Sequence, residues 1–247
     1  MRGVCLLVAL VAPAGVAAGC GIESAARFEH TTVKMHAFAG AVHEIVLRSE
    51  RGDVDLVQSG ERISVRETQH YGSARPAFAQ DVANGVLTLV SDCNGEPCDV
   101  DLRVTVPSAI KVTVDVAAGD IHAHGIAVRN AHLQCHSGNL SVELGGRQQL
   151  VWAHTDSGNV DAVAADASAV DAQSHSGNVA VDARHARSIV ARTDSGNVVV
   201  SVPAGDYAVD AHTQSGAVRV EGITRNDRAQ ESIQATTASG NVTVRTR

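Results

Sequence analysis

Apolar and polar residues alternate along the second half of the chain, and the alternation recurs around a repeated Ser-Gly pair. The glycines of these pairs follow one another at steps of 19 or 20 residues, with a last step of 24. Positions six and four before each Ser, and three and five after it, are always apolar, whereas the positions between them are mostly polar. This alternation with a period of two predicts two short strands per repeat, each with one buried face.

The same position in successive repeats holds the same kind of residue. The position six before the Ser, for example, is Ala131, Val151, Val170, Ile189, Val209 and Ile233 in the six repeats. In a meander of antiparallel hairpins successive strands reverse, so identical residues would not form columns at one period. The columns therefore favour parallel stacking. We predict an all-β, single-chain β-solenoid of the β-helix or β-roll type, with coils of roughly 19–20 residues and two short strands per coil.

A Ser-Gly-Asn tripeptide joins the two strands of most repeats. Glycine adopts positive φ at low steric cost, and Asn is the other residue that tolerates the left-handed region. Stacked Asn side chains would bond from coil to coil, with an interruption at Ala217, where the Asn is missing. The predicted structural turn residues are Gly52, Gly119, Ser137, Gly138, Asn139, Ser157, Gly158, Asn159, Ser176, Gly177, Asn178, Ser195, Gly196, Asn197, Ser215, Gly216, Ser239, Gly240 and Asn241.

The same frame extends upstream of the clear repeats. The expected inward residues are Ile45, Leu47, Ser49, Val54 and Leu56 around Gly52, and Val112, Val114, Val116 and Ile121 around Gly119. Further strands are expected over residues 62–67, 86–90 and 101–106, and residues 68–79 break the pattern and predict a loop. One solenoid domain is therefore expected over residues 30–247.

The N-terminus has the features of an export signal. Residues 1–19 begin with one Arg, continue as an apolar run and end in small residues, which is typical of a signal peptide. The junction "VAAGC" resembles the lipobox at which bacterial signal peptidase II cuts before a lipid-modified Cys, here Cys20. The alternative is an ordinary signal peptide with Cys20 incidental. We favour lipid attachment at Cys20, a tether over residues 20–29, and anchoring on the outer face of the bacterial cytoplasmic membrane, since two acyl chains anchor stably.

Three further cysteines belong to the exported part. Cys93 and Cys98 flank the turn-like "NGEP", and in an exported protein such a pair predicts a local disulfide. A metal site would need two more Cys or His at suitable spacing, and none is near. Cys135 lies in the inward column otherwise filled by Ser and Thr, which predicts a buried thiol.

Composition excludes one class of partner and shapes the core. The formal net charge is −7 and only six of 247 residues are aromatic. A nucleic-acid surface needs a basic stripe and usually aromatic stacking platforms, so no nucleic-acid partner is expected. The core is left to Val, Ala, Ile and Leu, which suits thin, regular layers.

The iterated motifs resemble a known family. They are "SGNV", its variants "RGDV" at Arg51 and "AGDI" at Ala118, and "DLRVTVPSAIKVTVDVAAGDI" from Asp101. Over residues 28–247 the chain is similar to the bacterial putative adhesin family of SGNV-type β-strand-repeat domains of unknown function. The resemblance implies a β-solenoid at the cell surface, often lipidated, with no catalytic motif to carry over.

One column of the repeats alternates in charge. The residue before each Ser is His136, Asp156, His175, Asp194 and then Gln214, and His154 and His212 lie two residues earlier in their repeats. His136, Asp156 and His175 are the candidate ligands of a metal such as Zn²⁺. Alternation also balances charge between neighbouring coils, and we favour this interpretation, with no metal and no cofactor.

These features together favour a lipid-anchored scaffold, adhesion or binding module without catalysis, whose partners are the membrane and cell-wall or surface components. The enzymatic alternative is a polysaccharide lyase or hydrolase, because Asp156 and Asp194 lie two coils apart on one face. Such an enzyme needs features that the sequence does not show. They are long loops that form a cleft, a cluster of Lys or Arg beside the Asp residues, and an aromatic platform for sugar rings beyond Trp152. A metal- or pH-responsive surface protein is the third hypothesis.

Overall fold

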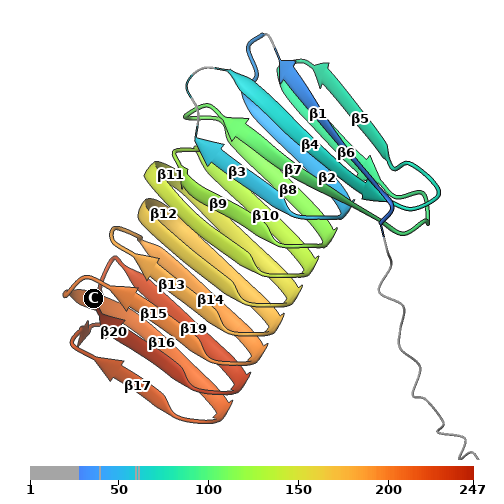
Figure 1. Cartoon of the computed structure of the whole chain (residues 1–247). Helices are drawn as coiled ribbons and strands as arrows, with labels where there is room; N and C mark the ends of the chain where they lie inside the picture. The colour runs from blue at the N-terminus through green and yellow to red at the C-terminus, as the bar shows by residue number, and fades with distance from the viewer. Residues whose placement is uncertain (1–27, 39, 59, 61) are drawn as a thin grey trace, which may run out of the picture.

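The computed structural model describes residues 28–247 except 39, 59 and 61. Twenty strands and no helix form the described part of the chain, and they join into one continuous curled sheet (Figure 1). The all-β prediction is therefore confirmed for these residues. None of them forms a helix long and apolar enough to cross a membrane. The predicted signal peptide, the predicted lipid-attachment site Cys20 and the predicted tether as far as residue 27 lie outside the described residues.

Most strands belong to a parallel stack of two rows. One row holds β2 (Glu44–Arg51), β6 (Val86–Asp92), β8 (Lys111–Ala118), β10 (Asn130–Ser137), β14 (Ser188–Ser195), β16 (Asp206–Ser215) and β19 (Ser232–Ser239). The other row holds β3 (Val54–Gln58), β7 (Cys98–Val106), β9 (Ile121–Ile126), β13 (Val179–Ala183), β15 (Val198–Val202), β17 (Val218–Glu221) and β20 (Val242–Thr246). The long strands β11 (Leu140–Ser157) and β12 (Val160–Ser176) run through both rows, and β18 (Thr224–Arg225) pairs with the start of β16.

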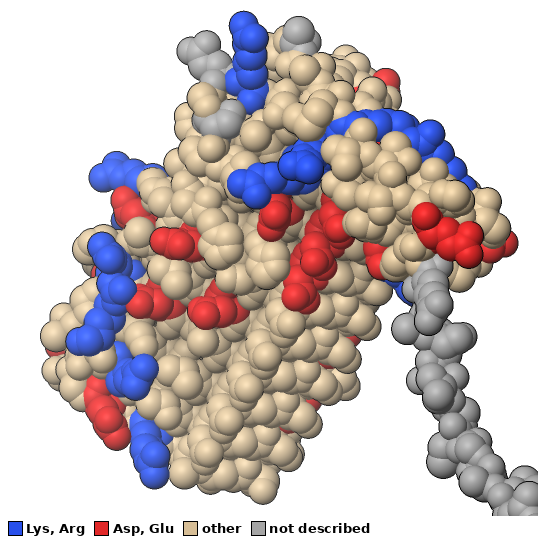
Figure 2. Space-filling view, in the orientation of Figure 1, with Lys and Arg blue, Asp and Glu red and all other residues tan. Residues whose placement is uncertain are grey.

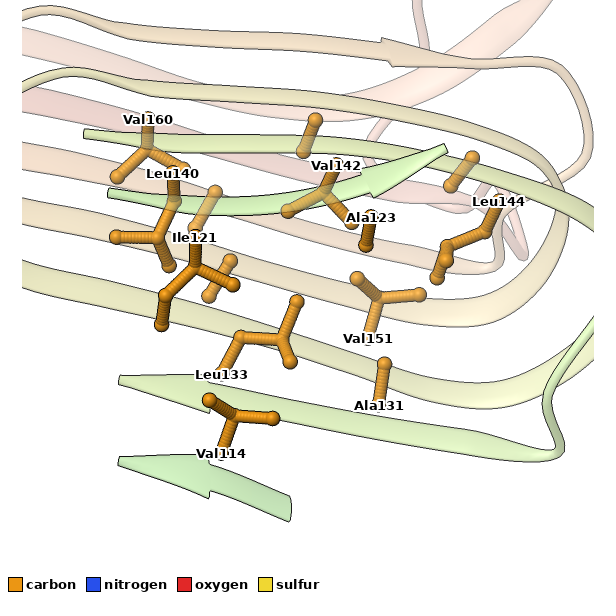
Figure 3. Packing of buried hydrophobic residues seen from close by; sticks show 14 of the residues in the cluster. Val114, Ile121, Ala123, Ala131, Leu133, Leu140, Val142, Leu144, Val151 and Val160 are labelled. Carbon is orange, nitrogen blue, oxygen red and sulfur yellow. The ribbon is translucent and has the colours of Figure 1, made fainter. Parts of the chain in front are cut away.

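The two rows enclose a thin apolar core. Val114, Leu133 and Val151 point from one row toward Leu140 and Val160 of the other (Figure 3). The inward columns expected from the repeats are buried in every repeat except the one at Ser215. That repeat forms the outermost coil of the stack, where Val218 is 39% exposed because no further strand covers it.

Glycine is required at the turns by space as well as by φ. Gly177 has φ of +154°, and a Cβ added there would overlap the carbonyl oxygen of Gly158 in the adjacent coil. An inward hydroxyl completes this contact, because Ser174 Oγ donates a 2.8 Å hydrogen bond to the same Gly158 carbonyl. The equivalent donors in other coils are Thr155, Thr193, Thr213, Thr237 and the thiol of Cys135.

Asparagine side chains form a ladder outside the turns. The backbone N–H of Asn178 donates to Oδ1 of Asn159 at 2.8 Å, and its side-chain amide donates to the same oxygen at 3.2 Å. The ladder continues in the same way from Asn178 through Asn197 to Asn241. The sequence did not reveal that aspartates extend it toward the N-terminus, from Asn139 through Asp120 and Asp53 to Asp101.

The order of the coils differs from the order of the chain at both ends. β2 and β3 lie between β6–β7 and β8–β9, and β19 and β20 lie between β14–β15 and β16–β17. The predicted interruption of the ladder at Ala217 is therefore wrong. Asn241 bonds directly to Asn197, and Ala217 ends the ladder by donating its N–H to Asn241 Oδ1 at 3.0 Å. An outermost coil needs no Asn, because no further N–H requires an acceptor.

Antiparallel strands cover the N-terminal end of the stack. β4 (Ile63–Tyr71) pairs with β7 and with β1 (His30–Phe38), and β5 (Ala77–Ala83) pairs with β6. The loop predicted over residues 68–79 is therefore wrong at both ends, since β4 continues to Tyr71 and β5 begins at Ala77. The alternation Thr68, Gln69, His70 did not reveal a strand because its buried member, Gln69, is polar.

The structure describes the three cysteines for which the sequence predicts a local disulfide and a buried thiol. Cys93 and Cys98 form a disulfide with a Cα–Cα distance of 5.6 Å. Cys135 is a free, buried cysteine, and burial raises the pKa of its thiol to about 11. A thiol that stays protonated at neutral pH is a poor nucleophile, so Cys135 has a structural role.

Candidate functional site

The alternating His and Asp residues lie on the outward surface of one row of the stack. We call this surface the ladder face; its residues are Asp115, His132, His136, Trp152, His154, Asp156, Asp171, His175, Arg192 and Asp194, from β8, β10, β11, β12 and β14. Parallel, in-register pairing places these side chains in columns, since residues of one face alternate along each strand.

The imidazoles of the ladder face are already paired with carboxylates. His136 Nδ1 lies 2.8 Å from Asp156 Oδ2, and its Nε2 lies 3.8 Å from Asp115 Oδ1. His175 Nδ1 lies 2.6 Å from Asp194 Oδ2. Each of these side chains is about half exposed or more, which places the pairs among exposed ion pairs, worth about 0–1 kcal/mol each.

The candidate metal ligands are not brought together on one centre. His136 and Asp156 are in contact, but His175 turns to Asp194 in the next coil. Within residues 28–247, as far as they are described, no group of three or more His, Cys, Asp or Glu side chains is arranged to hold a metal ion. Gln214 does not continue the column after Asp194 either, because the inserted β19 places Ala238 between them.

A third pair on the ladder face is more enclosed. His154 Nε2 lies 3.1 Å from Asp171 Oδ1, and Gln173 Nε2 donates to the same oxygen at 2.7 Å. Burial alone would raise the pKa of Asp171, but the hydrogen bonds from His154 and Gln173 outweigh it, so the pKa is lowered. Asp171 is therefore an ionised acceptor that fixes the orientation of both neighbours.

The single tryptophan of the chain stands on this face between two histidines. The ring centroids of His132 and Trp152 lie 3.8 Å apart with an interplanar angle of 5°, and those of Trp152 and His154 lie 3.6 Å apart. His132 comes from β10, whereas His154 leans toward Asp171 on β12, so the imidazoles reach the indole from opposite sides. The indole is thus held rigidly and offers mainly its edge to a ligand. Burial, with His154 and Lys111 nearby, lowers the pKa of His132.

A shallow hollow of about 580 Å³ opens between these columns. Trp152, His154, Gln173, His175 and Arg192 are among its lining residues. The lining combines fixed hydrogen-bond donors and acceptors with an aromatic edge. It includes Cys135 and Ser174, but both are buried and donate to glycine carbonyls of the adjacent coil, so neither is placed as a nucleophile beside a base. Its chemistry suits the binding of a polar ligand. From the sequence, the His–Asp column pointed to this face, but the roles of Trp152, Asp171 and Arg192 were missed, because each occupies its column in one coil alone.

A second charged region lies where the N-terminal strands meet the stack. Figure 2 shows acidic side chains gathered beside a ridge of basic ones in this part of the molecule. A hollow there is lined by Asp53, Asp55, Asp101, Arg66 and Arg103, among others. The carboxylates of Asp53 and Asp101 already accept backbone hydrogen bonds in the ladder of Asn and Asp side chains at the turns, which gives them a structural role.

The pair of His136 and Asp156 gives a prediction for pH. The hydrogen bond from His136 to Asp156 raises the pKa of the imidazole. The pair therefore stabilises the fold below the ordinary His pKa of about 6.5, and this contribution is lost as the pH rises through the raised value. We expect His136→Ala to lower the melting temperature slightly at about pH 5.5 and to have less effect at about pH 8. An equal effect at both values, measured by thermal denaturation, would show that the pair has no charged contribution.

The described part of the chain matches a family of known sequences and is similar to several solved structures. The family model described as Toastrack DUF4097 matches residues 28–247. The fold is similar to that of a "putative cell adhesion protein" from Clostridium sporogenes ATCC 15579, at 10% identity and TM-score 0.41, with 88% of this chain and 100% of that chain covered. It is also similar to a "putative adhesin" from Parabacteroides merdae ATCC 43184, at 12% identity and TM-score 0.46, with 87% and 96% covered. A "putative adhesin" from Bacteroides fragilis NCTC 9343 gives 14% identity and TM-score 0.38, with 90% and 99% covered. No curated protein matches the sequence.

Proposed function

The chain belongs to the Toastrack DUF4097 family, and we propose that it is a non-catalytic binding or scaffold module of the cell surface. The observation that carries the proposal is the pairing on the ladder face. His136, His154 and His175 each bond a carboxylate of the same face, so none is presented to a substrate as a free base beside a nucleophile. What remains is a rigid, polar and shallow surface, which can hold a ligand through many weak contacts.

The finer description of the fold supports this role. We propose a unit coil of 19–20 residues, with two short strands joined by Ser-Gly-Asn. Its support is the register in which Ser137, Ser157, Ser176 and Ser195 lie side by side in successive coils. A stack in which each coil contacts only its neighbours gives an extended and repetitive surface, the form that other repeat proteins use for binding.

The experiment is retention on cell-wall fractions. We expect the exported chain to be retained, and a Trp152→Ala, Arg192→Ala variant to be retained less, because both residues line the hollow of the ladder face. Arg245→Ala is the matched control, since Arg245 projects from the other row of the stack. Absence of retention of the native chain would reject the binding role. Release of soluble sugar from the fractions would instead support the carbohydrate-active alternative.

Anchoring through Cys20 is a separate proposal, supported by the "VAAGC" junction after the apolar run. We expect the native protein to enter the detergent phase of a phase-partition experiment and to incorporate labelled palmitate. A Cys20→Ser variant should do neither, because the acyl chains attach at that residue. A native protein that stays in the aqueous phase without label would show that Cys20 is not lipid-modified.

A further inference from the structure

The C-terminal coil, β19 with β20, fills a slot between two coils that precede it in the chain. β19 pairs on one side with β14 and on the other with β16, and β20 pairs likewise with β15 and β17. We call the space between β14–β15 and β16–β17 the C-terminal slot. In Figure 1 the two strands lie inside the stack rather than at its end, with β16 and β17 beyond them.

The walls of the C-terminal slot match each other as well as they match the coil between them. Ile189 pairs with Ile233, which pairs with Val209, and the same three-coil alignment holds for Ala191, Ala235 and Ala211. Parallel pairing in this register would therefore also be possible between β14 and β16 directly. The slot is thus an insertion site whose closure without the coil would cost little in register or packing.

The hydrogen-bond groups of the two walls are interchangeable in the same way. Thr237 Oγ1 donates to the Gly196 carbonyl at 3.0 Å, and Thr213 Oγ1 donates to the Gly240 carbonyl at 2.9 Å. Without the coil, Thr213 would find the Gly196 carbonyl in the equivalent place. Likewise the N–H of Ala217, which now bonds Asn241 Oδ1, could bond the side chain of Asn197. A stack closed in this way satisfies its polar groups.

Synthesis order makes the closed form accessible. β16 and β17 leave the ribosome before β19 and β20, because synthesis proceeds from the N-terminus at about 5–20 residues per second. The only coil then available to β16–β17 is β14–β15. The wall formed by β16–β17 must later separate from it to admit the C-terminal coil, which is joined to β17 through residues 222–231.

We propose that the C-terminal slot also receives the C-terminal coil of a second copy of this chain. The contacts made by an exchanged coil are the same as those made within one chain, so exchange requires only separation of the wall and reach of the linker. Some contacts favour retention on the β14–β15 side, including the 2.7 Å ion pair of Arg247 with Asp182. Asp182 lies on the receiving copy's stack and Arg247 belongs to the exchanged segment, so a foreign coil can form the same ion pair. Two copies that stand on two opposing surfaces would thereby be joined through the exchanged coil, β19 with β20.

Cysteine cross-linking between two full-length copies tests the exchange. One copy carries Asp210→Cys and the other carries Gln234→Cys, and both carry Cys5→Ser, Cys20→Ser and Cys135→Ser, so that only the introduced thiols remain free beside the Cys93–Cys98 disulfide. A Ser at position 135 keeps a donor for the Gly119 carbonyl, as Ser174 does for the Gly158 carbonyl. Asp210 and Gln234 are paired across β16 and β19. Adjacent strands lie about 4.8 Å apart, within the Cα–Cα range of disulfides, about 4.4–6.8 Å. Neither copy can form this bond within itself.

Exchange predicts a disulfide-linked heterodimer after the two copies are refolded together under mild oxidation. The matched control joins Asp171→Cys and Val190→Cys, which are paired across β12 and β14 in the middle of the stack. We expect no heterodimer there, because exchange would require opening half of the molecule. Equal yields from both combinations, or no heterodimer with positions 210 and 234, would overturn the proposal. Dimers of the Asp210→Cys copy alone would show end-to-end association of β16, and would also overturn it.

Discussion

Gly177→Ala is expected to lower the free energy of unfolding by about 2–6 kcal/mol, from backbone strain and overpacking together. Gly177 has φ of +154°, in the region that an L side chain rarely adopts, and the added Cβ would overlap the Gly158 carbonyl. Relief by movement would separate two coils, which would also break the hydrogen bond of Ser174 to that carbonyl. Chemical denaturation followed by circular dichroism measures the change.

Gly145→Ala is the matched control for this substitution. Gly145 lies in β11, has no positive φ, and would place its Cβ in open space. We expect a change within about 0.5 kcal/mol, as for a substitution that removes no specific interaction. His175→Ala, on the exposed ladder face, should also stay within about 0.5 kcal/mol. Similar losses for Gly177→Ala and Gly145→Ala would contradict the requirement for glycine at the contact between coils.

The buried columns could be predicted from the sequence because they follow from local alternation. Ile45, Leu47, Val112 and Val114 are all fully buried, as expected for one face of a strand. This works because each coil sees the same environment, so each position has one physical requirement repeated many times. The buried hydroxyl at Thr155 belongs to such a column, but its partner, the Gly138 carbonyl of the preceding coil, became visible only in the structure.

The order of the coils could not be predicted from the sequence. A repeat specifies what its neighbour must look like, but Ser215 and Ser239 belong to repeats that are nearly alike, so either could follow Ser195. Only Ala217 distinguished them. If the coils were stacked in chain order, the missing Asn at position 217 would interrupt the asparagine ladder. In the structure it instead marks the outermost coil, where the ladder ends. Long-range choice between equivalent partners is information that local pattern does not carry.

The sequence predicted which column of residues forms the candidate site, but it did not predict all the contacts between their side chains. His136 and Asp156 were expected to be neighbours and are in contact. The pairing of His154 with Asp171 was not foreseen, because these residues stand two positions apart along the strand direction and meet only when the imidazole leans across. Side-chain direction of this kind depends on the stacked indole of Trp152, which occurs once in the chain.

The second large effect is expected in the core. Leu133 is fully buried in β10 between β8 and β11. We expect Leu133→Ala to lower the free energy of unfolding by about 2–5 kcal/mol, because the thin core is built largely from Val and Ala and has few large side chains that could move into the cavity. Since each coil of a stack depends on its neighbours, the loss should weaken the coils on both sides. Hydrogen exchange should show faster opening in β8 and β11 as well as in β10.

Leu150→Ala provides the same chemical change at an exposed position. Leu150 lies in β11 and is 41% exposed, so its truncation should change the free energy of unfolding by no more than about 0.5 kcal/mol. If both substitutions cost the same, burial between the two rows would not be the source of stability. If Leu133→Ala accelerated exchange in β10 alone, the coils would be independent rather than coupled, and a stack of independent coils could not unfold as one unit.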